Sequence, residues 1–395
     1  MSMIVTAVGS GLASSGGAPT VAGIPTVSAD TPPPGLAAVT FNNTTNDQPA
    51  LQALLDYVKA TYGGGRVVLS KPNGAGVRLN AGITIPAKVQ LVSDETTLIN
   101  ASPFTTGAAI TVNDVDFTPL VGIRMDGGLF TPVTADLTNS YTGIKVTGRG
   151  LRIENIHLQY FGRGVDLATS GTFCNTIVGG HMSHVATGFY VDLEAAGNPV
   201  AGERNMIRDF TVANSRRGFN ASNGGNHLRF ENVSVDFTDE VGRINNAHVY
   251  YQGHIETTDP YIFDVAGNSM LQMSDTELVL GQAVLFKTGV GPSNPGFGGA
   301  RFDNCVCFFT SATGVSGTIR SEHTVSWPAN TTSLTLYVPY PLKWTPVSAQ
   351  FVYLDGTTVP NNDVITIGAS PSATGQLNMT APTNAAARWA RIKFG

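Results

Sequence analysis

The feature that most limits the fold is a six-residue pattern that recurs between residues 125 and 307. Each copy begins and ends with an apolar residue and holds Gly, Asn or Asp at its third position. These three residue types tolerate a left-handed backbone better than other residues do. Each copy therefore predicts a strand, a sharp corner and another strand. The copies begin at Met125, Ile153, Ile177, Ile207, Phe230, Met273 and Phe302, and their third residues are Gly127, Asn155, Gly179, Asp209, Asn232, Asp275 and Asn304.

A second element follows each copy, and it consists of a small residue and then alternating apolar residues. It begins 10 to 12 residues after five of the copies and 17 or 18 residues after the other two, at Ala247 and Gly143. The whole unit repeats every 23 to 30 residues, with one gap of 43. Three short strands per repeat predict a β-solenoid, in which neighbouring rungs stack at roughly 4.8 Å and bury a shared core.

The N-terminal part predicts the one clear helix of the chain, over residues 46–63. Asn46 or Asp47 can cap it, Pro49 suits its first turn and Gly63 can end it. Leu51, Leu54, Leu55 and Val58 have helical spacing. Strands are expected at 66–70, 83–85 and 88–92. We expect the helix to cap the open end of the solenoid, because a bare end exposes unpaired strand edges.

The two ends of the chain differ from the repeats between them. Residues 1–40 contain no Lys or Arg, which argues against a secretory signal. They consist mainly of Ala, Gly, Ser, Thr and Pro and cannot build a core, which predicts a linker or an arm that becomes ordered only against a partner. After residue 322, alternating segments such as "SLTLYV" and "AQFVYL" predict a small β-sandwich. The predicted domains are thus the arm at 1–40, the solenoid at 41–322 and the sandwich at 323–395.

Composition excludes several classes of partner. The net charge is −5 and the basic residues form no long run, so a nucleic-acid partner is not expected. No apolar run reaches the roughly 18 residues that a membrane span needs, so membrane insertion is not expected either. Cys305 and Cys307 are interpreted as small buried residues, and no metal or other cofactor is predicted.

The segment "NDQPALQALLDYVKATYGGGRVVLS" at 46–70 resembles the entry motif of pectate-lyase-like right-handed β-helices, and the rungs "IENI", "IRDF" and "FENV" resemble theirs. With the arm and the C-terminal domain, the chain resembles a phage tail spike or tail-fibre receptor-binding protein. The resemblance implies an all-β, right-handed parallel β-helix in the virion tail that forms a homotrimer. It also implies contacts of the arm with other tail proteins, a C-terminal domain for trimerisation or receptor binding, and a host surface glycan as ligand.

Candidate site residues come from three segments that interrupt the repeat, at 192–204, 236–246 and 253–264, because function on a solenoid lies where its repeat is interrupted. The first and third are expected to leave the same corner, two rungs or roughly 10 Å apart. A glycosidase needs two carboxylates. The catalytic candidates are Glu203, Asp239, Glu240 and Glu256, and the substrate-binding candidates are Asp192, Arg204, Asp236, Arg243, Tyr251, Asp259 and Tyr261.

Other interpretations stay open beside this one. Asp209 and Asp275 share the corner position of the asparagines, which favours a structural role. His157 and His181 share the fifth position of their copies and are expected to stack on one face. The leading function is a virion protein that binds a host polysaccharide and cleaves it by hydrolysis. The alternatives are a structural or adhesive tail-tip protein without activity, a polysaccharide lyase with Arg204 or His254 as its base, and a secreted pectate-lyase-type enzyme.

Overall fold

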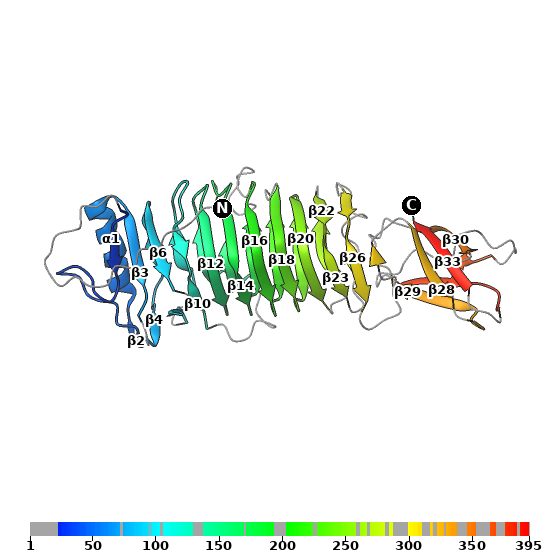
Figure 1. The fold of residues 1–395 in the computed structure, drawn as a ribbon, viewed down its shortest axis with the longest axis horizontal. Helices are drawn as coiled ribbons and strands as arrows, with labels where there is room; N and C mark the ends of the chain where they lie inside the picture. The colour runs from blue at the N-terminus through cyan, green and yellow to red at the C-terminus, as the bar shows by residue number, and fades with distance from the viewer. Residues whose placement is uncertain are drawn as a thin grey trace.

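The computed structural model shows an elongated coil of strands, with the helix α1 at one end and two small sheets at the other (Figure 1). It describes residues 23–394, apart from gaps at 72–73, 95, 103–105, 129–136, 170, 193–202, 224–226, 258–260, 267–268, 281–283, 287–298, 310–316, 319–321, 328, 338–345, 353–363, 369–375 and 385–387.

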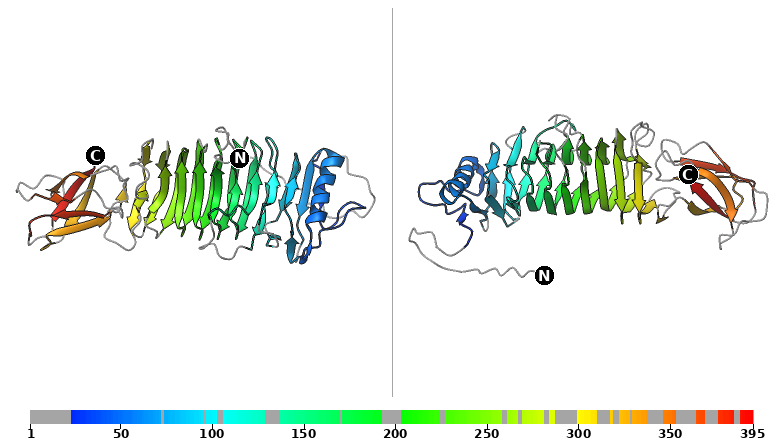
Figure 2. Two further views of the ribbon diagram at one scale, coloured as in Figure 1. Left: turned by 180° about the vertical axis from the view of Figure 1, so that it is seen from behind. Right: turned by 90° about the horizontal axis from the view of Figure 1, so that it is seen from above.

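The coil consists of three ladders of parallel strands, stacked rung upon rung (Figure 2). Five long strands are bent and belong to both ladder 1 and ladder 2: β12 (Arg152–Gln159), β14 (Thr176–Ser183), β16 (Met206–Ala213), β18 (Leu228–Asp236) and β20 (His248–Thr257). Parallel strands joined by crossovers adopt the right-handed sense. The predicted right-handed parallel β-helix is therefore confirmed.

Shorter strands complete the ladders. Ladder 1 also contains β1 (Thr26–Ser28), β3 (Gly65–Leu69), β6 (Val89–Ser93), β9 (Leu120–Val121), β22 (Met270–Ser274) and β25 (Gly299–Asp303). Ladder 2 also contains β2 (Asn42–Asn46), β4 (Gly76–Arg78), β7 (Leu98–Asn100), β10 (Arg124–Asp126), β23 (Glu277–Leu280) and β26 (Val306–Phe309), and β26 pairs antiparallel with β27 (Gly317–Thr318).

Ladder 3 is a separate nine-stranded sheet that closes each turn of the coil. Its strands are β5 (Ile83–Ile85), β8 (Ala108–Val112), β11 (Thr142–Val146), β13 (Arg163–Asp166), β15 (Thr187–Asp192), β17 (Arg217–Ser222), β19 (Glu240–Asn245), β21 (Tyr261–Ala266) and β24 (Val284–Phe286).

The bend between ladders 1 and 2 lies at the third residue of the repeated pattern. Asn155, Asp209, Asn232, Asp275 and Asn304 all have φ between 45° and 52°. Their side chains also pair between rungs, since the Asn232 amide donates to Asp209 at 2.8 Å and the Asn304 amide donates to Asp275 at 2.8 Å. The left-handed corner is thus confirmed for the copies from Ile153 onward, and Asp209 and Asp275 have the structural role that their position favoured. The copy at Met125 was wrong: Leu120 pairs with Ile153 and Met125 with Leu158, so the corner of this rung is Gly122, with φ of 69°, and not Gly127.

The gap of 43 residues hides one further rung, which is β20. Sequence analysis missed it because β20 has Gln252 where its neighbours place a corner residue. The second element after Phe230 was also misplaced at Ala247. Gly188 pairs with Gly218 in ladder 3, and the equivalent residue of the next rung is Val241, 11 residues after Phe230.

Inward-facing side chains form a continuous core along the axis. Phe189, Phe210, Phe219, Phe230 and Phe263 are all buried, and neighbouring rings among them lie 4.6 to 6.3 Å apart between centroids. Cys305 and Cys307 are also fully buried, as predicted. Aromatic stacking and apolar burial along the axis hold each rung to the next.

The helix α1 (Gln48–Tyr62) lies at the N-terminal end of the coil, where Leu51, Leu54, Leu55 and Val58 pack inward as predicted. Gly63 ends it in a left-handed conformation. Asp47 is the N-cap residue, one of the two predicted, but its carboxylate makes no capping hydrogen bond and accepts hydrogen bonds from Thr40 instead. Within the segment predicted as an arm, β1 pairs with β3 inside ladder 1, and residues 1–22 lie outside the described residues.

The C-terminal strands form two three-stranded antiparallel sheets, one of β28 (Glu322–Trp327), β33 (Arg388–Phe394) and β30 (Pro346–Val352), the other of β29 (Ser333–Tyr337), β32 (Gln376–Thr380) and β31 (Thr366–Ile367). Trp327, Phe351, Leu377 and Ile392 are buried there. The sandwich and the domain division remain predictions. In the described part of the chain, no helix is both long and apolar enough to cross a membrane.

Candidate functional site

The outer face of ladder 2 carries two parallel rows of polar side chains, because alternate residues of each strand point outward and the rungs are in register. We call this surface the polar face. Residues paired in the first row are Arg124, His157, His181, Thr211, Ser234, His254 and Glu277, and those in the second are Asp126, Gln159, Ser183, Ala213, Asp236 and Glu256. The predicted pairing of His157 with His181 is confirmed.

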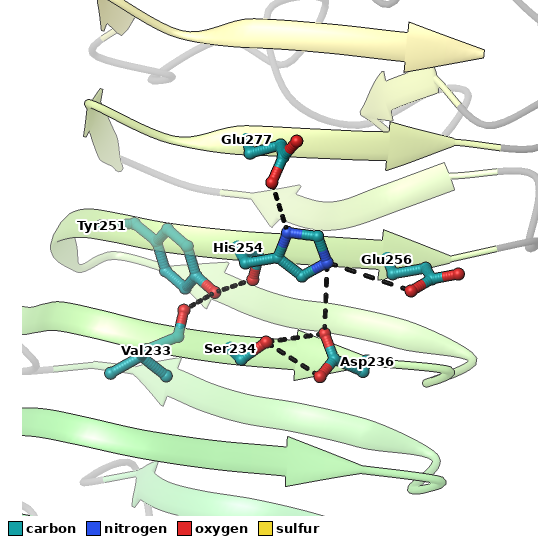
Figure 3. Close-up of polar contacts among 7 residues, drawn as sticks. All are labelled: Val233, Ser234, Asp236, Tyr251, His254, Glu256 and Glu277. Atoms are coloured by element: carbon teal, nitrogen blue, oxygen red, sulfur yellow. Dashed lines mark hydrogen bonds and ion pairs between the residues drawn. The ribbon is translucent and has the colours of Figure 1, made fainter. Parts of the chain in front are cut away.

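Five side chains meet on β18, β20 and β23 and form the His254 cluster: Ser234, Asp236, His254, Glu256 and Glu277 (Figure 3). Nε2 of His254 lies 3.7 Å from Asp236 Oδ1 and 3.9 Å from Glu256 Oε2, while Nδ1 lies 3.1 Å from Glu277 Oε2. The Ser234 hydroxyl lies 2.8 Å from both oxygens of Asp236. Because Asp236 Oδ1 and Glu256 Oε2 lie 3.7 and 3.9 Å from the same Nε2 atom, the distance between these two oxygens is at most the sum of the two values. That limit admits the carboxyl spacing of a retaining glycosidase, about 5–5.5 Å, and the short end of the inverting range, about 6.5–9.5 Å.

The bend of β20 is one residue shorter than its neighbours, and this shortening forms a hollow beside the cluster. Phe230 pairs with Tyr251 and Val233 with Gly253, so Gln252 alone faces Glu231 and Asn232. Gly253 is required there, because its φ is 152° and a Cβ would lie 2.0 Å from the Val233 carbonyl oxygen. The resulting hollow, of about 680 Å³, is lined by Asp209, Phe210, Thr211, Asn232, Val233, Ser234, Gln252, Gly253, His254 and Asp275.

Tyr251 fills the inside of the shortened bend. Its side chain is buried, and its hydroxyl lies 2.9 Å from the carbonyl oxygen of Val233 and 3.0 Å from that of His254 (Figure 3). Burial raises the pKa of this phenol well above its usual value, so it stays a hydrogen-bond donor. The backbone of His254 is therefore fixed from within the core.

Two smaller hollows lie on the same face, on either side of the first. One, of about 280 Å³, is bounded by Arg124, His157, Gln159 and His181, and the other, of about 340 Å³, by Asp275, Glu277, Asn304 and Phe308. Because all three follow the stacked rungs, the polar face is a shallow groove along the axis rather than a closed pocket. Such a surface suits an extended chain molecule.

The predicted catalytic residues lie in three different places. Only Glu256 belongs to the His254 cluster. Glu203 lies ahead of β16, 3.9 Å from Arg204, and Asp239 lies in a turn, 3.4 Å from Arg216. Glu240 begins β19 and is almost fully buried in an ion pair with Arg217 at 2.6 Å. Since this pair is closed from solvent, Glu240 does not fit the catalytic role predicted for it.

The predicted substrate-binding residues are also dispersed. Asp236 belongs to the cluster, whereas Asp192 and Arg243 lie in ladder 3 and Arg204 lies at the start of β16. Stacking of Tyr251 on a sugar does not fit the structure, because its ring is in the core. Asp259 and the side chain of Tyr261 lie outside the described residues.

The predicted interruptions of the repeat need a second correction. Residues 236–246 are a regular part of the coil, since they contain β19. The segment after Asp192 leaves ladder 3, whereas the segment after Thr257 leaves ladder 2, so the two do not share a corner. Two members of the cluster, Ser234 and Glu277, were missed. Both could have been found in the sequence, because outward-facing residues alternate along each strand and the residues that pair with them on the neighbouring rungs face the same way.

Among the described residues, no group of three or more His, Cys, Asp or Glu side chains is placed to hold a metal ion.

Comparison with known proteins gives structural neighbours only. No family model matches the chain, and a search of curated proteins found no match. Similar solved structures include a tailspike protein mutant of E. coli bacteriophage HK620 in complex with a pentasaccharide, with a TM-score of 0.49 and 11% identity, covering 93% of each chain. The tailspike protein of Acinetobacter phage vB_ApiP_P1 has a TM-score of 0.42 and 9% identity, covering 94% of this chain and 87% of that one.

DFA-IIIase from Arthrobacter chlorophenolicus A6 is also similar, with a TM-score of 0.47 and 11% identity, covering 73% of this chain and 86% of that one. At these identities the likeness concerns the fold.

Proposed function

We propose that this chain is a phage tail spike that binds a host surface polysaccharide along the polar face and hydrolyses its glycosidic bonds at the His254 cluster. The observation that carries the proposal is the placement of Asp236 and Glu256 on neighbouring rungs, both in contact with the same imidazole. The groove beside them and the sequence resemblance to tail spikes support the location in a virion tail.

The two carboxyl groups take different parts in the proposed reaction. Asp236 accepts hydrogen bonds from Ser234 and faces His254, which suits the acceptor role of a base or nucleophile. Glu256 has a more exposed side chain, 38% against 21% for Asp236, and takes the role of the acid. Glu256 donates a proton to the glycosidic oxygen as the bond from that oxygen to the anomeric carbon breaks. If water attacks the anomeric carbon directly, Asp236 accepts its proton as the base. If Asp236 attacks first, water breaks the resulting glycosyl–Asp236 bond and gives its proton to Glu256, which restores the acid.

His254 acts in this proposal as a positioning residue. It lies between the two carboxylates and Glu277, so it can keep the pair at a working distance. Glu277 in turn fixes the imidazole through Nδ1.

The test is the release of reducing ends from capsule, cell-wall and lipopolysaccharide glycans of candidate hosts, followed together with absorbance near the unsaturated-uronate band. We expect reducing ends without that band, and a loss of at least 100-fold in rate for Asp236→Asn and for Glu256→Gln, in line with the typical contribution of acid–base catalysis, about 10²–10⁴-fold. Asp239→Asn is the matched control, since it removes a nearby exposed carboxylate that pairs with Arg216.

Three outcomes would contradict the proposal. Reducing ends with the unsaturated band would indicate a lyase. Retention of a glycan without any release would indicate an adhesin. Equal losses in the control and in the two cluster variants would place the catalytic pair elsewhere.

A further inference from the structure

A second pocket lies on the outer side of ladder 1, away from the polar face, and we call it the basic-aromatic pocket. It has a volume of about 400 Å³ and is lined by Arg204, Met206, His227, Arg229 and Tyr250. Met206, Arg229 and Tyr250 pair in register on β16, β18 and β20, so their side chains leave three neighbouring rungs in the same direction. The pocket lies at the beginning of these strands, whereas the His254 cluster lies beyond their bends.

The pocket contains a stacking surface. The rings of His227 and Tyr250 are nearly parallel, at 24°, with their centroids 6.1 Å apart. The guanidinium of Arg229 lies over the Tyr250 ring, 5.6 Å from its centroid. An aromatic ring with an apolar neighbour such as Met206 offers a flat surface to the apolar face of a sugar.

The charge of the pocket selects the kind of sugar. Arg204 and Arg229 have side chains that are 71% and 50% exposed, and their acidic neighbours Glu203 and Glu231 stand at 3.9 and 3.4 Å. Ion pairs this exposed are weak, so both guanidinium groups can exchange those partners for a ligand carboxylate. Arginine binds carboxylates through two parallel hydrogen bonds, which a compact ammonium cannot provide.

We infer that the basic-aromatic pocket is a second, non-catalytic glycan site that binds a carboxylate-bearing sugar. The sugar ring lies on Tyr250, and its carboxylate is held by Arg229 and Arg204. The polar face presents Asp236, Glu256 and Glu277 and would repel the same group. The two surfaces therefore have different roles. The basic-aromatic pocket binds an acidic sugar of the polysaccharide, and the polar face cleaves a bond elsewhere in it.

The experiment measures binding of the full chain to a galacturonate hexamer, a sialic acid trimer and the carboxyl-reduced neutral form of each, by isothermal titration calorimetry. We expect at least one acidic oligosaccharide to bind at least tenfold more tightly than its reduced form. Tyr250→Ala and Arg229→Ala should each lose tenfold or more of that affinity, and Tyr250→Phe should retain it because the ring remains.

Arg152→Ala is the matched control. Arg152 is 49% exposed and pairs with Glu154 two residues on, as Arg229 pairs with Glu231, but it lies outside the basic-aromatic pocket, three rungs from Arg229 in the same ladder. It should keep full affinity. The inference is overturned if neither acid binds better than its reduced form, if Tyr250→Ala binds as the unmodified chain does, or if single-stranded DNA binds better than both acids.

This inference takes from the proposed function only that the ligand is a glycan, and the two can fail separately. If Asp236→Asn abolishes hydrolysis while Tyr250→Ala leaves binding unchanged, the second site is wrong and the proposed function stands. If Tyr250→Ala abolishes binding of the acidic oligosaccharide and no glycan is ever cleaved, the catalytic proposal alone is wrong.

Discussion

Replacing Tyr251 by Phe should loosen the shortened bend of β20 without creating a large cavity. The ring stays in the core, but the buried carbonyl oxygen of Val233 and the partly buried one of His254 lose the hydroxyl that lies 2.9 and 3.0 Å from them. A buried polar group left without a partner costs about 1–3 kcal/mol. Since about 1.4 kcal/mol corresponds to a factor of ten, amide hydrogens of β18 and β20 should exchange roughly 5- to 150-fold faster.

Native-state hydrogen exchange read by mass spectrometry is the suitable assay, because it reports local opening and needs no reversible unfolding of the whole coil. Tyr141→Phe is the control, since the Tyr141 hydroxyl is also buried and donates to one carbonyl, that of Ala101, at 2.7 Å. It should accelerate exchange only around its own rungs and leave hydrolysis unchanged, whereas Tyr251→Phe should slow hydrolysis. Unchanged exchange in β20 of a folded Tyr251→Phe protein would refute the view that this hydroxyl anchors the bend.

Three further predictions concern the coil itself. Asn232→Val should lower the unfolding temperature more than Asn232→Gly, because a left-handed backbone costs an L-residue roughly 1–2 kcal/mol and glycine almost nothing; equal shifts would contradict the role of the corner. Glu240→Ala should destabilise the chain by about 3–5 kcal/mol in urea unfolding, since it leaves Arg217 buried and unpaired, and the double variant with Arg217→Ala should recover part of the loss. Burial and the nearby His157 lower the pKa of His181 below 6.5, despite the opposing charge of Asp236. His181 should therefore not affect the stability above pH 6.5 and should lower it below that pH, where the unfolded chain takes up the proton first. In thermal unfolding scans, His181→Gln should flatten this decline.

The fold could be predicted because its rules are local and repeat. A corner residue at the third position needs a left-handed backbone in every copy from Ile153 onward, and the residues of the helix that pack inward follow helical spacing. One rung escaped because β20 lacks the corner residue that defines the pattern. The bend of β20, which is one residue short, is the reason that the sequence pattern does not show this rung, and the same bend forms the hollow of about 680 Å³ on the polar face.

The candidate site was predicted less well, because its members come together through register rather than through sequence distance. Asp236 and Glu256 were both named, but they were assigned to interruptions of the repeat and not to one outward row of neighbouring strands. Glu240 looks like any other loop acid in the sequence. Only its position beside Arg217 shows that it is a buried structural charge.

The shortened bend of β20 indicates that a coil of this kind can be redesigned one rung at a time. One residue is missing, yet the strand halves on both sides keep their pairing with β18, β22 and β23. The change in length is absorbed within a single rung and does not propagate to the next. Binding clefts could then be moved along this scaffold, or multiplied on it, by deleting a corner residue and placing glycine after it in any chosen rung, while the remaining rungs serve as an unchanged frame.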